Sequence, residues 1–196
     1  MTAFTGNRGA PAAEGDGRRR ACCVRHVAGC GFQLRGAFEL PAELVPVYID
    51  APRDSDVAGQ LHQLLRRNNV EVATDRAAAA SVIEIVGEQR ERRVLTVSAA
   101  TADVDEFELR YTTQWLLRDT GEERRALTNL ETVEILRDYT YDRGAVLAKQ
   151  SEEADLLERM QEDTALRILY RIQAWNQDFV PEPADVEAQL EKERRD

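Results

Sequence analysis

The feature that most constrains the fold is the stretch from Arg137 to Trp175, which joins the end of an expected strand to the longest expected helix. Its apolar residues recur at steps of mostly three and four, which is the period of one helical face. They are Ala154, Leu157, Met160, Ala165, Ile168, Ile172 and Trp175. We therefore expect a long amphipathic helix whose apolar face is buried against the rest of the chain.

A regular alternation of apolar and polar residues between Glu106 and Arg118 predicts a strand with one buried and one polar face. Phe107, Leu109, Tyr111, Thr113, Trp115 and Leu117 form the expected buried face. Large side chains contribute about 1.5–3 kcal/mol each when fully buried, so this face should form a main part of the core.

The preceding region predicts one strand and one short helix. Leu44 to Ala51 carries β-branched and aromatic residues between prolines, as a first strand would. Asp54 or Ser55 is the expected N-cap of a helix whose single apolar stripe is Val57, Leu61, Leu64 and Leu65 and which ends near Asn68.

Two further strands complete the predicted sheet. One begins at Ser81 to Val86 and continues toward Val97, and the last runs from Ala126 to Tyr139 after a turn at Asp119 to Glu122. The order is strand, helix, three strands, helix (β-α-β-β-β-α). It predicts an α+β fold with two helices packed on one face of a mostly antiparallel four-stranded sheet.

Composition excludes several classes of function. A formal net charge of -10 and an aromatic content of 6% argue against nucleic-acid binding, which needs a basic surface. No run approaches the roughly 18 apolar residues of a membrane span. Beyond Cys30 the chain has one histidine, His62, and no cysteine, so we expect no metal site and no cofactor.

We also expect the protein not to be an enzyme. Glu131 and Glu134 are the carboxylates that a hydrolase would have to use, but their spacing of three residues puts them on opposite faces of a strand.

The N-terminal region contains a candidate lipid-attachment site. Val27, Ala28 and Gly29 precede Cys30 as small residues precede the acylated cysteine of a bacterial lipoprotein. Acyl chains on Cys30 would anchor a soluble domain, since each buried CH₂ contributes about 0.8 kcal/mol. The apolar run before it, Ala21 to Val24, is shorter than a signal peptide requires, so residues 1–29 are interpreted as a degenerate or misassigned signal region.

Five short motifs together resemble the LPS-assembly lipoprotein family LptE (RlpB). They are Cys-Gly-Phe-x-Leu-Arg-Gly from Cys30 to Gly36, Tyr-x-Tyr-Asp from Tyr139 to Asp142, Val-Leu-Ala-Lys from Val146 to Lys149, the pair Glu152 and Glu153, and Met160 followed by Asp163. The resemblance implies a lipoprotein on the periplasmic side of the outer membrane. Its implied role is to plug and help assemble the LptD β-barrel in a 1:1 complex, and to take part in lipopolysaccharide transport.

The resemblance also implies site residues. Lys149 matches the lysine that contacts lipopolysaccharide, and it and Lys192 are the only lysines of a chain otherwise rich in arginine. The hairpin Ser98 to Asp105 is acidic where the family carries a basic residue, so Arg93 and Arg110, or Arg92, would have to substitute. Tyr139 and Tyr141 are expected barrel contacts, with packing in the core or at an edge as the alternative for each.

The expected organisation is therefore a signal region (1–29), an LptE-like domain (30–175) and a flexible acidic tail (176–196), whose part from Ala184 to Arg195 is compatible with a solvated helix. The alternative function is a cytosolic or periplasmic interaction module without enzymatic activity, including a soluble lipopolysaccharide chaperone that binds no barrel.

Overall fold

The structure is a computed structural model that describes residues 38–175 and 181–193. The contacts divide the chain into two units, Met1–Gln33 and Leu34–Asp196, and all described residues belong to the second. Cys30 and the expected signal region lie outside the described residues.

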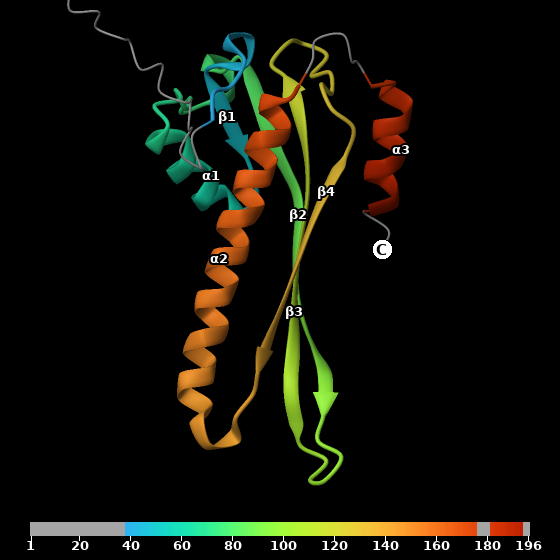
Figure 1. The fold of residues 1–196 in the computed structure, drawn as a ribbon. Helices are drawn as coiled ribbons and strands as arrows, with labels where there is room; N and C mark the ends of the chain where they lie inside the picture. Colours follow the sequence, from blue (N-terminus) through green and yellow to red (C-terminus); the bar gives the residue numbers. More distant parts are fainter. Residues whose placement is uncertain (1–37, 176–180, 194–196) are drawn as a thin grey trace, which may run out of the picture. The chain divides into compact units, whose positions relative to one another are not determined.

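Four strands and three helices form the described unit (Figure 1). In chain order they are β1 (Val47–Asp50), α1 (Asp56–Arg67), β2 (Ser81–Val97), β3 (Val104–Asp119), β4 (Glu131–Thr140), α2 (Val146–Gln173) and α3 (Pro183–Glu193). Short 3-10 turns lie at Ala42–Leu44, Arg76–Ala78 and Arg143–Ala145.

The sheet has the order β1-β2-β3-β4. β1 runs parallel to β2, with Val47 opposite Ser81, and the two other pairs are antiparallel. A parallel pair needs a crossover, which α1 supplies between β1 and β2. The predicted fold class, an α+β fold with a mostly antiparallel four-stranded sheet, is confirmed.

The first strand is shorter than predicted. The sequence suggested Leu44 to Ala51, but Leu44 ends a 3-10 turn, and its carbonyl accepts a hydrogen bond from Ser81 Oγ at 2.6 Å. Pro46 has no N–H to give to a ladder. β1 is therefore confined to the four residues that follow the proline.

The last strand also begins later than predicted, at Glu131 rather than Ala126. Ala126 makes only an isolated bridge with Arg118. Two residues further on, a side chain takes the place of a backbone acceptor, because the Thr128 hydroxyl accepts a hydrogen bond from the N–H of Leu117 at 2.9 Å.

β2 contains a register shift between Ile85 and Gly87 that reverses which residues face the helices. Before the shift Ile85 lies opposite Trp115; after it Arg92 lies opposite Leu109. Odd-numbered residues of β2 therefore face the helices before the shift and even-numbered residues do so after it.

α1 forms as the sequence predicted. Ser55 is its N-cap, with Oγ accepting the N–H of Ala58 at 3.1 Å, and Asn69 follows the helix with a positive φ of 56°. The four predicted apolar residues, Val57, Leu61, Leu64 and Leu65, are all buried in the main core.

The buried face of α2 differs from the predicted one. Ala154 is exposed, and the first fully buried residue of the helix is Met160. Thr164 and Gln161 are buried although both are polar. Gln161 Nε2 donates to Asp56 at the start of α1 at 2.9 Å, so α2 packs against α1 as well as the sheet and buries a wider face.

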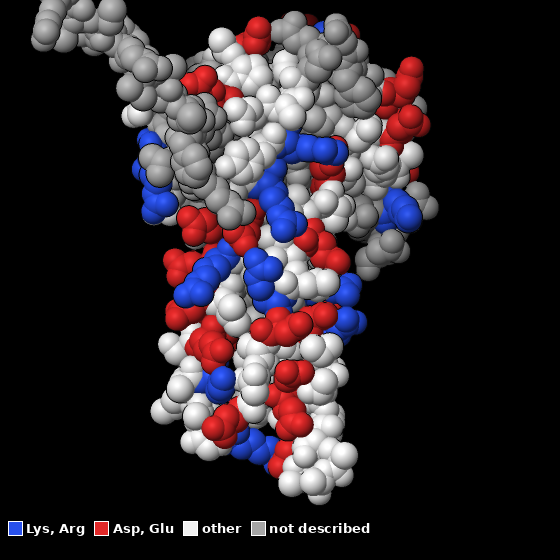
Figure 2. Space-filling view, viewed as in Figure 1, with Lys and Arg blue, Asp and Glu red and all other residues white. Residues whose placement is uncertain are grey.

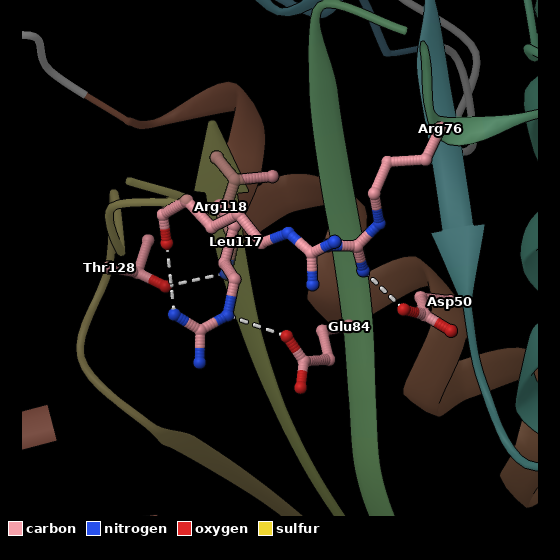
Figure 3. A network of polar contacts seen from close by, with 7 residues as sticks. Asp50, Arg76, Glu84, Leu117, Arg118 and Thr128 are labelled. Carbon is pink, nitrogen blue, oxygen red and sulfur yellow. Dashed lines mark hydrogen bonds and ion pairs between the residues drawn. The ribbon is translucent and has the colours of Figure 1, made fainter. Parts of the chain in front are cut away.

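The face of the sheet away from α1 and α2, here called the outer face, is polar over most of its length. At the β1 end it carries the ion pairs of Arg76 with Asp50 and of Arg118 with Glu84 (Figure 3). Arg118 Nε lies 2.6 Å from the Glu84 carboxylate.

α3 lies against the connection between β3 and β4. Val186 is only 2% exposed, and Gln189 Oε1 accepts the N–H of Leu130 at 3.3 Å. A helix was compatible with the sequence here, but it is not fully solvated as expected, because Val186 is buried.

Candidate functional site

An aromatic and charged cluster lies between the N-terminal half of α2 and the sheet. We call Arg92 (β2), Phe107 (β3), Tyr139 (β4), Tyr141 and Glu153 (α2) the distal cluster. Phe107 lies opposite Tyr139 on β4 and opposite Val94 on β2, so the register brings these side chains to the face that α2 covers.

The Glu153 carboxylate holds the distal cluster together. Its Oε2 accepts hydrogen bonds from Tyr139 Oη at 2.6 Å and from Arg92 Nη1 at 2.9 Å. The strands β2 and β4 therefore both reach one carboxylate oxygen of α2, through charge-assisted hydrogen bonds.

The aromatic rings pack beside this carboxylate. Phe107 stacks on Tyr139 with ring centroids 5.7 Å apart and meets the edge of Tyr141 at 5.2 Å. The Arg92 guanidinium lies 4.9 Å from the centre of the Phe107 ring, within cation-π distance.

Burial and charge change the ionisation of the cluster. Burial, together with the hydrogen bond to Glu153, raises the pKa of Tyr139 to about 12. The same carboxylate raises the pKa of Arg92 above its ordinary value. At neutral pH the cluster is therefore a protonated phenol and a guanidinium around one carboxylate.

Lys149 lies one helical turn before Glu153 on α2. Its Nζ forms an ion pair with Glu152 Oε2 at 2.8 Å, and its side chain is largely covered. Arg92 is a sheet cation on the same side as Lys149, because it contacts α2 through Glu153.

Arg93 and Arg110 lie on the outer face instead. Arg93 Nε is 2.6 Å from Glu108 Oε1, an ion pair without the alignment of a hydrogen bond, and Arg110 Nη1 is 3.5 Å from Glu134 Oε2. The structure thus brings Arg93 and Arg110 together but separates them from Lys149. The register shift in β2 is the reason for Arg93, whereas Arg110 lies on the outer face through the alternation of β3.

A family model described as LptE, lipopolysaccharide-assembly, matches residues 44–172. The chain belongs to the LptE family. An LPS-assembly lipoprotein LptE of Photorhabdus laumondii is 34% identical over 71 residues, which are 36% of this chain and 39% of the relative. The match thus spans well under half of that relative's length.

Two solved lipoprotein structures are similar over most of the described chain. Lipoprotein B of Nitrosomonas europaea is 32% identical with a TM-score of 0.61, covering 74% of this chain and 91% of its own. Rare lipoprotein B of Shewanella oneidensis is 27% identical with a TM-score of 0.55, covering 74% and 98% respectively.

The two tyrosines expected to contact a barrel are placed differently in this LptE-family domain. Tyr139 is 5% exposed and belongs to the main core, as the alternative for this residue proposed. Tyr141 is partly buried beside Phe107 and its N–H bonds to the carbonyl of Asp105 at 2.8 Å.

Exposed apolar side chains surround the start of α2 and the loop between β2 and β3, which lie at the same end of the sheet (Figure 1). Arg143, just before α2, forms an ion pair with Asp103 in that loop. Leu147 is 83% exposed, and Val94 and Val97 are about half exposed. Sequence periodicity did not single out these residues, because a short apolar stretch at a helix start is also typical of core.

The carboxylates considered for hydrolysis have separate partners on the two faces. Glu131 pairs with Arg171 of α2 at 3.4 Å, whereas Glu134 pairs with Arg110 on the outer face. Within residues 38–175 and 181–193, no group of three or more metal-ligating side chains could hold a metal ion. None of the helices in these ranges has the apolar length that a membrane span requires.

Proposed function

We propose that this LptE-family protein acts in lipopolysaccharide assembly as a lipid-anchored plug of the LptD β-barrel, on the periplasmic side of the outer membrane. The match of the LptE model to residues 44–172 supports this role. So do the relatives, which are described as an LPS-assembly lipoprotein and as lipoproteins B.

The polar outer face is the structural observation that carries the proposal. An uncovered sheet face in water usually needs polar side chains, and here they are organised as cross-strand ion pairs, Arg93 with Glu108 and Arg110 with Glu134. The lumen of a wide membrane barrel is itself polar. A domain with such a face can lie against the lumen wall without burying unpaired apolar surface.

In this proposal, acyl chains on Cys30 anchor the protein to the membrane. The described helices do not span a membrane, whereas acyl chains on one cysteine hold a folded domain at a bilayer surface.

For lipopolysaccharide contact we propose Lys149, next to the distal cluster. Lys149 offers a cation for a phosphate or carboxylate, and the exposed Leu147 offers an apolar surface nearby on the same helix. Lipopolysaccharide combines anionic and apolar parts, so a cationic and an apolar side chain in the same turn of the helix suit it. Arg93 and Arg110 would form a second, separate contact on the outer face.

The test is a pull-down from detergent-solubilised membranes of the native host, with a tag after Asp196 and mass spectrometry of the captured proteins. Recovery of an outer-membrane barrel in equal amount supports the plug. A Cys30→Ala variant is the matched control and should lose its membrane retention. A protein recovered only from the cytosol, without a barrel, would reject the proposal in favour of the interaction module.

A further inference from the structure

The contacts between α2 and β4 lengthen toward the C-terminal end of the helix. Arg137 Nη2 on β4 lies 2.8 Å from Asp163 Oδ2 on α2. About two turns further along the helix, Arg171 Nη2 is 3.4 Å from the nearest Glu131 oxygen. Here the two elements border a cavity of about 370 Å³, also lined by Trp115 and Arg167.

Trp115 lines this cavity and carries an unused hydrogen-bond donor. Its side chain is fully buried, and its indole Nε1 has no acceptor among the described residues. The indole of Trp175, in contrast, donates to the carbonyl of Leu127 at 3.1 Å. A buried donor without a partner costs about 1–3 kcal/mol, so an acceptor brought to Trp115 would recover part of that cost.

The helix side of the cavity supplies two guanidinium groups. Arg167 and Arg171 are one turn apart on α2 and both are exposed. Among the described residues, Arg167 Nη1 reaches only the backbone carbonyl of Glu134, at 3.4 Å. The Glu134 carboxylate pairs with Arg110 on the outer face, which leaves Glu131 as the carboxylate that contacts these arginines.

Among the side chains that line this cavity, two guanidinium groups and one indole N–H therefore share the Glu131 carboxylate, since the Glu134 carboxylate pairs with Arg110. On the face shown in Figure 2, basic side chains gather over the C-terminal half of α2, with acidic ones beside them. Guanidinium groups bind phosphate through two parallel hydrogen bonds, and such charge-assisted bonds are stronger than neutral ones.

We propose that the cavity between α2 and β4 is a binding site for a phosphate-class oxyanion, held by Arg167, Arg171 and the indole N–H of Trp115. A tetrahedral oxyanion has enough oxygens to accept from all three donors. The site lies away from Lys149 and deepens the proposed function, on which it rests for one of two sources of the anion. These are a phosphorylated glycolipid and free inorganic phosphate.

The test follows the two indole N–H resonances of the ¹⁵N-labelled full chain by NMR during a titration with sodium phosphate, against sodium chloride at equal ionic strength. A Trp175→Phe variant assigns the two signals. We expect the Trp115 signal to move saturably with phosphate and the Trp175 signal to stay in place.

Two variants sharpen the result. R167Q/R171Q should weaken phosphate binding by at least about tenfold, the loss expected for one charge-assisted hydrogen bond. Glu131→Gln should tighten it, because the change removes the carboxylate that competes for Arg171. An unmoved Trp115 signal, or an equal shift in R167Q/R171Q, would overturn the proposal.

The source is distinguished by repeating the titration with micelles of a phosphorylated glycolipid and of the same lipid after phosphate removal. A response to the phosphorylated lipid supports the glycolipid source, and a response to inorganic phosphate alone assigns the site to the free ion. Because this titration needs no barrel, a failed pull-down and a failed phosphate response remain separate results.

Discussion

Tyr139 at the end of β4 donates a hydrogen bond to Glu153 of α2, with 2.6 Å between the two oxygens. The contact matters because the helix has no fully buried residue before Met160. The polar contacts of Glu153 with Tyr139 and Arg92 therefore help to hold the N-terminal part of α2 to the sheet, whereas fully buried side chains hold the part from Met160 onward.

Removing this hydroxyl should destabilise the domain. Tyr139→Phe keeps the ring stacked on Phe107 but loses a hydrogen bond to a carboxylate, so we expect the free energy of unfolding at pH 7 to fall by about 1–2 kcal/mol. Urea denaturation measures it. The matched control is Tyr170→Phe, since Tyr170 is 40% exposed. Equal midpoints for both variants would contradict the structural role of the contact.

Stability should fall with pH in the range where tyrosine ionises. The pKa of Tyr139 is raised to about 12, and burial followed by the bond to Glu88 raises that of Tyr111. The folded protein therefore holds these protons more tightly than the unfolded chain, whose tyrosines ionise near pH 10. The resulting stability is fully present below about pH 10 and is lost as the pH rises toward 12.

Denaturation curves between pH 8 and 12, combined with tyrosinate absorbance, test this dependence. In Tyr139→Phe the decline above about pH 10 should be smaller than in the natural sequence. An identical decline would show that Tyr139 does not carry the effect.

The N-cap of α1 should contribute measurably to stability. Ser55 Oγ accepts the N–H of Ala58, and its hydroxyl donates to Glu88, which also accepts from Tyr111. Ser55→Ala should lower the free energy of unfolding by about 0.5–2 kcal/mol. Thermal melting measures the change, with Ser151→Ala on the exposed side of α2 as the control expected to leave the melting temperature unchanged.

The proposed lipopolysaccharide contact predicts a difference between the only two lysines of the sequence. Lys149→Gln should weaken lipopolysaccharide binding about two- to fivefold, the range for one partly exposed charge pair. Lys192→Gln changes the net charge equally, on α3, and should leave the affinity unchanged. Binding of both variants to immobilised lipopolysaccharide checks this, and equal losses would assign the effect to net charge.

The packing of α3 should depend on one apolar side chain. Val186 is buried whereas Ala188 is exposed, so Val186→Asp should release the helix and Ala188→Asp should not. Hydrogen exchange of the α3 amides is the measurement. Faster exchange in both variants, or in neither, would contradict anchoring by Val186.

Several elements could be predicted from the sequence because their pattern is both local and strong. The stripe of α1 and the alternation of β3 each match one period only, and their predicted apolar residues are buried except Phe107, which is partly buried. Element ends were less predictable. The start of β4 depends on Thr128, because its hydroxyl replaces a backbone group as the acceptor for the N–H of Leu117. The periodicity of the sequence gives no indication of such a bond.

The candidate site was predictable in part. The motif containing Lys149 pointed to the start of α2. Packing in the core was one of the alternatives predicted for Tyr139, and its side chain is buried there. Arg92 was named with Arg93 and Arg110 as a possible substitute for the basic hairpin residue, but the sequence did not show that Arg92 alone of the three contacts α2 through Glu153. The orphan donor of Trp115 had no sequence signal at all, because an apolar position in a strand does not reveal whether its indole finds an acceptor.

The sequence by itself determined the order of strands and helices, the family and the apolar faces of α1 and β3, since each rests on local periodicity or on short motifs. Only the tertiary structure decided which face each charged residue of β2 occupies. From Glu88 to Arg93 that strand is polar on both sides, so alternation there carries no information about direction. The register shift at Val86 and the pairing of Arg92 with Leu109 determine the direction of each side chain. As a result, Arg92 lies beside α2 and Arg93 lies on the outer face.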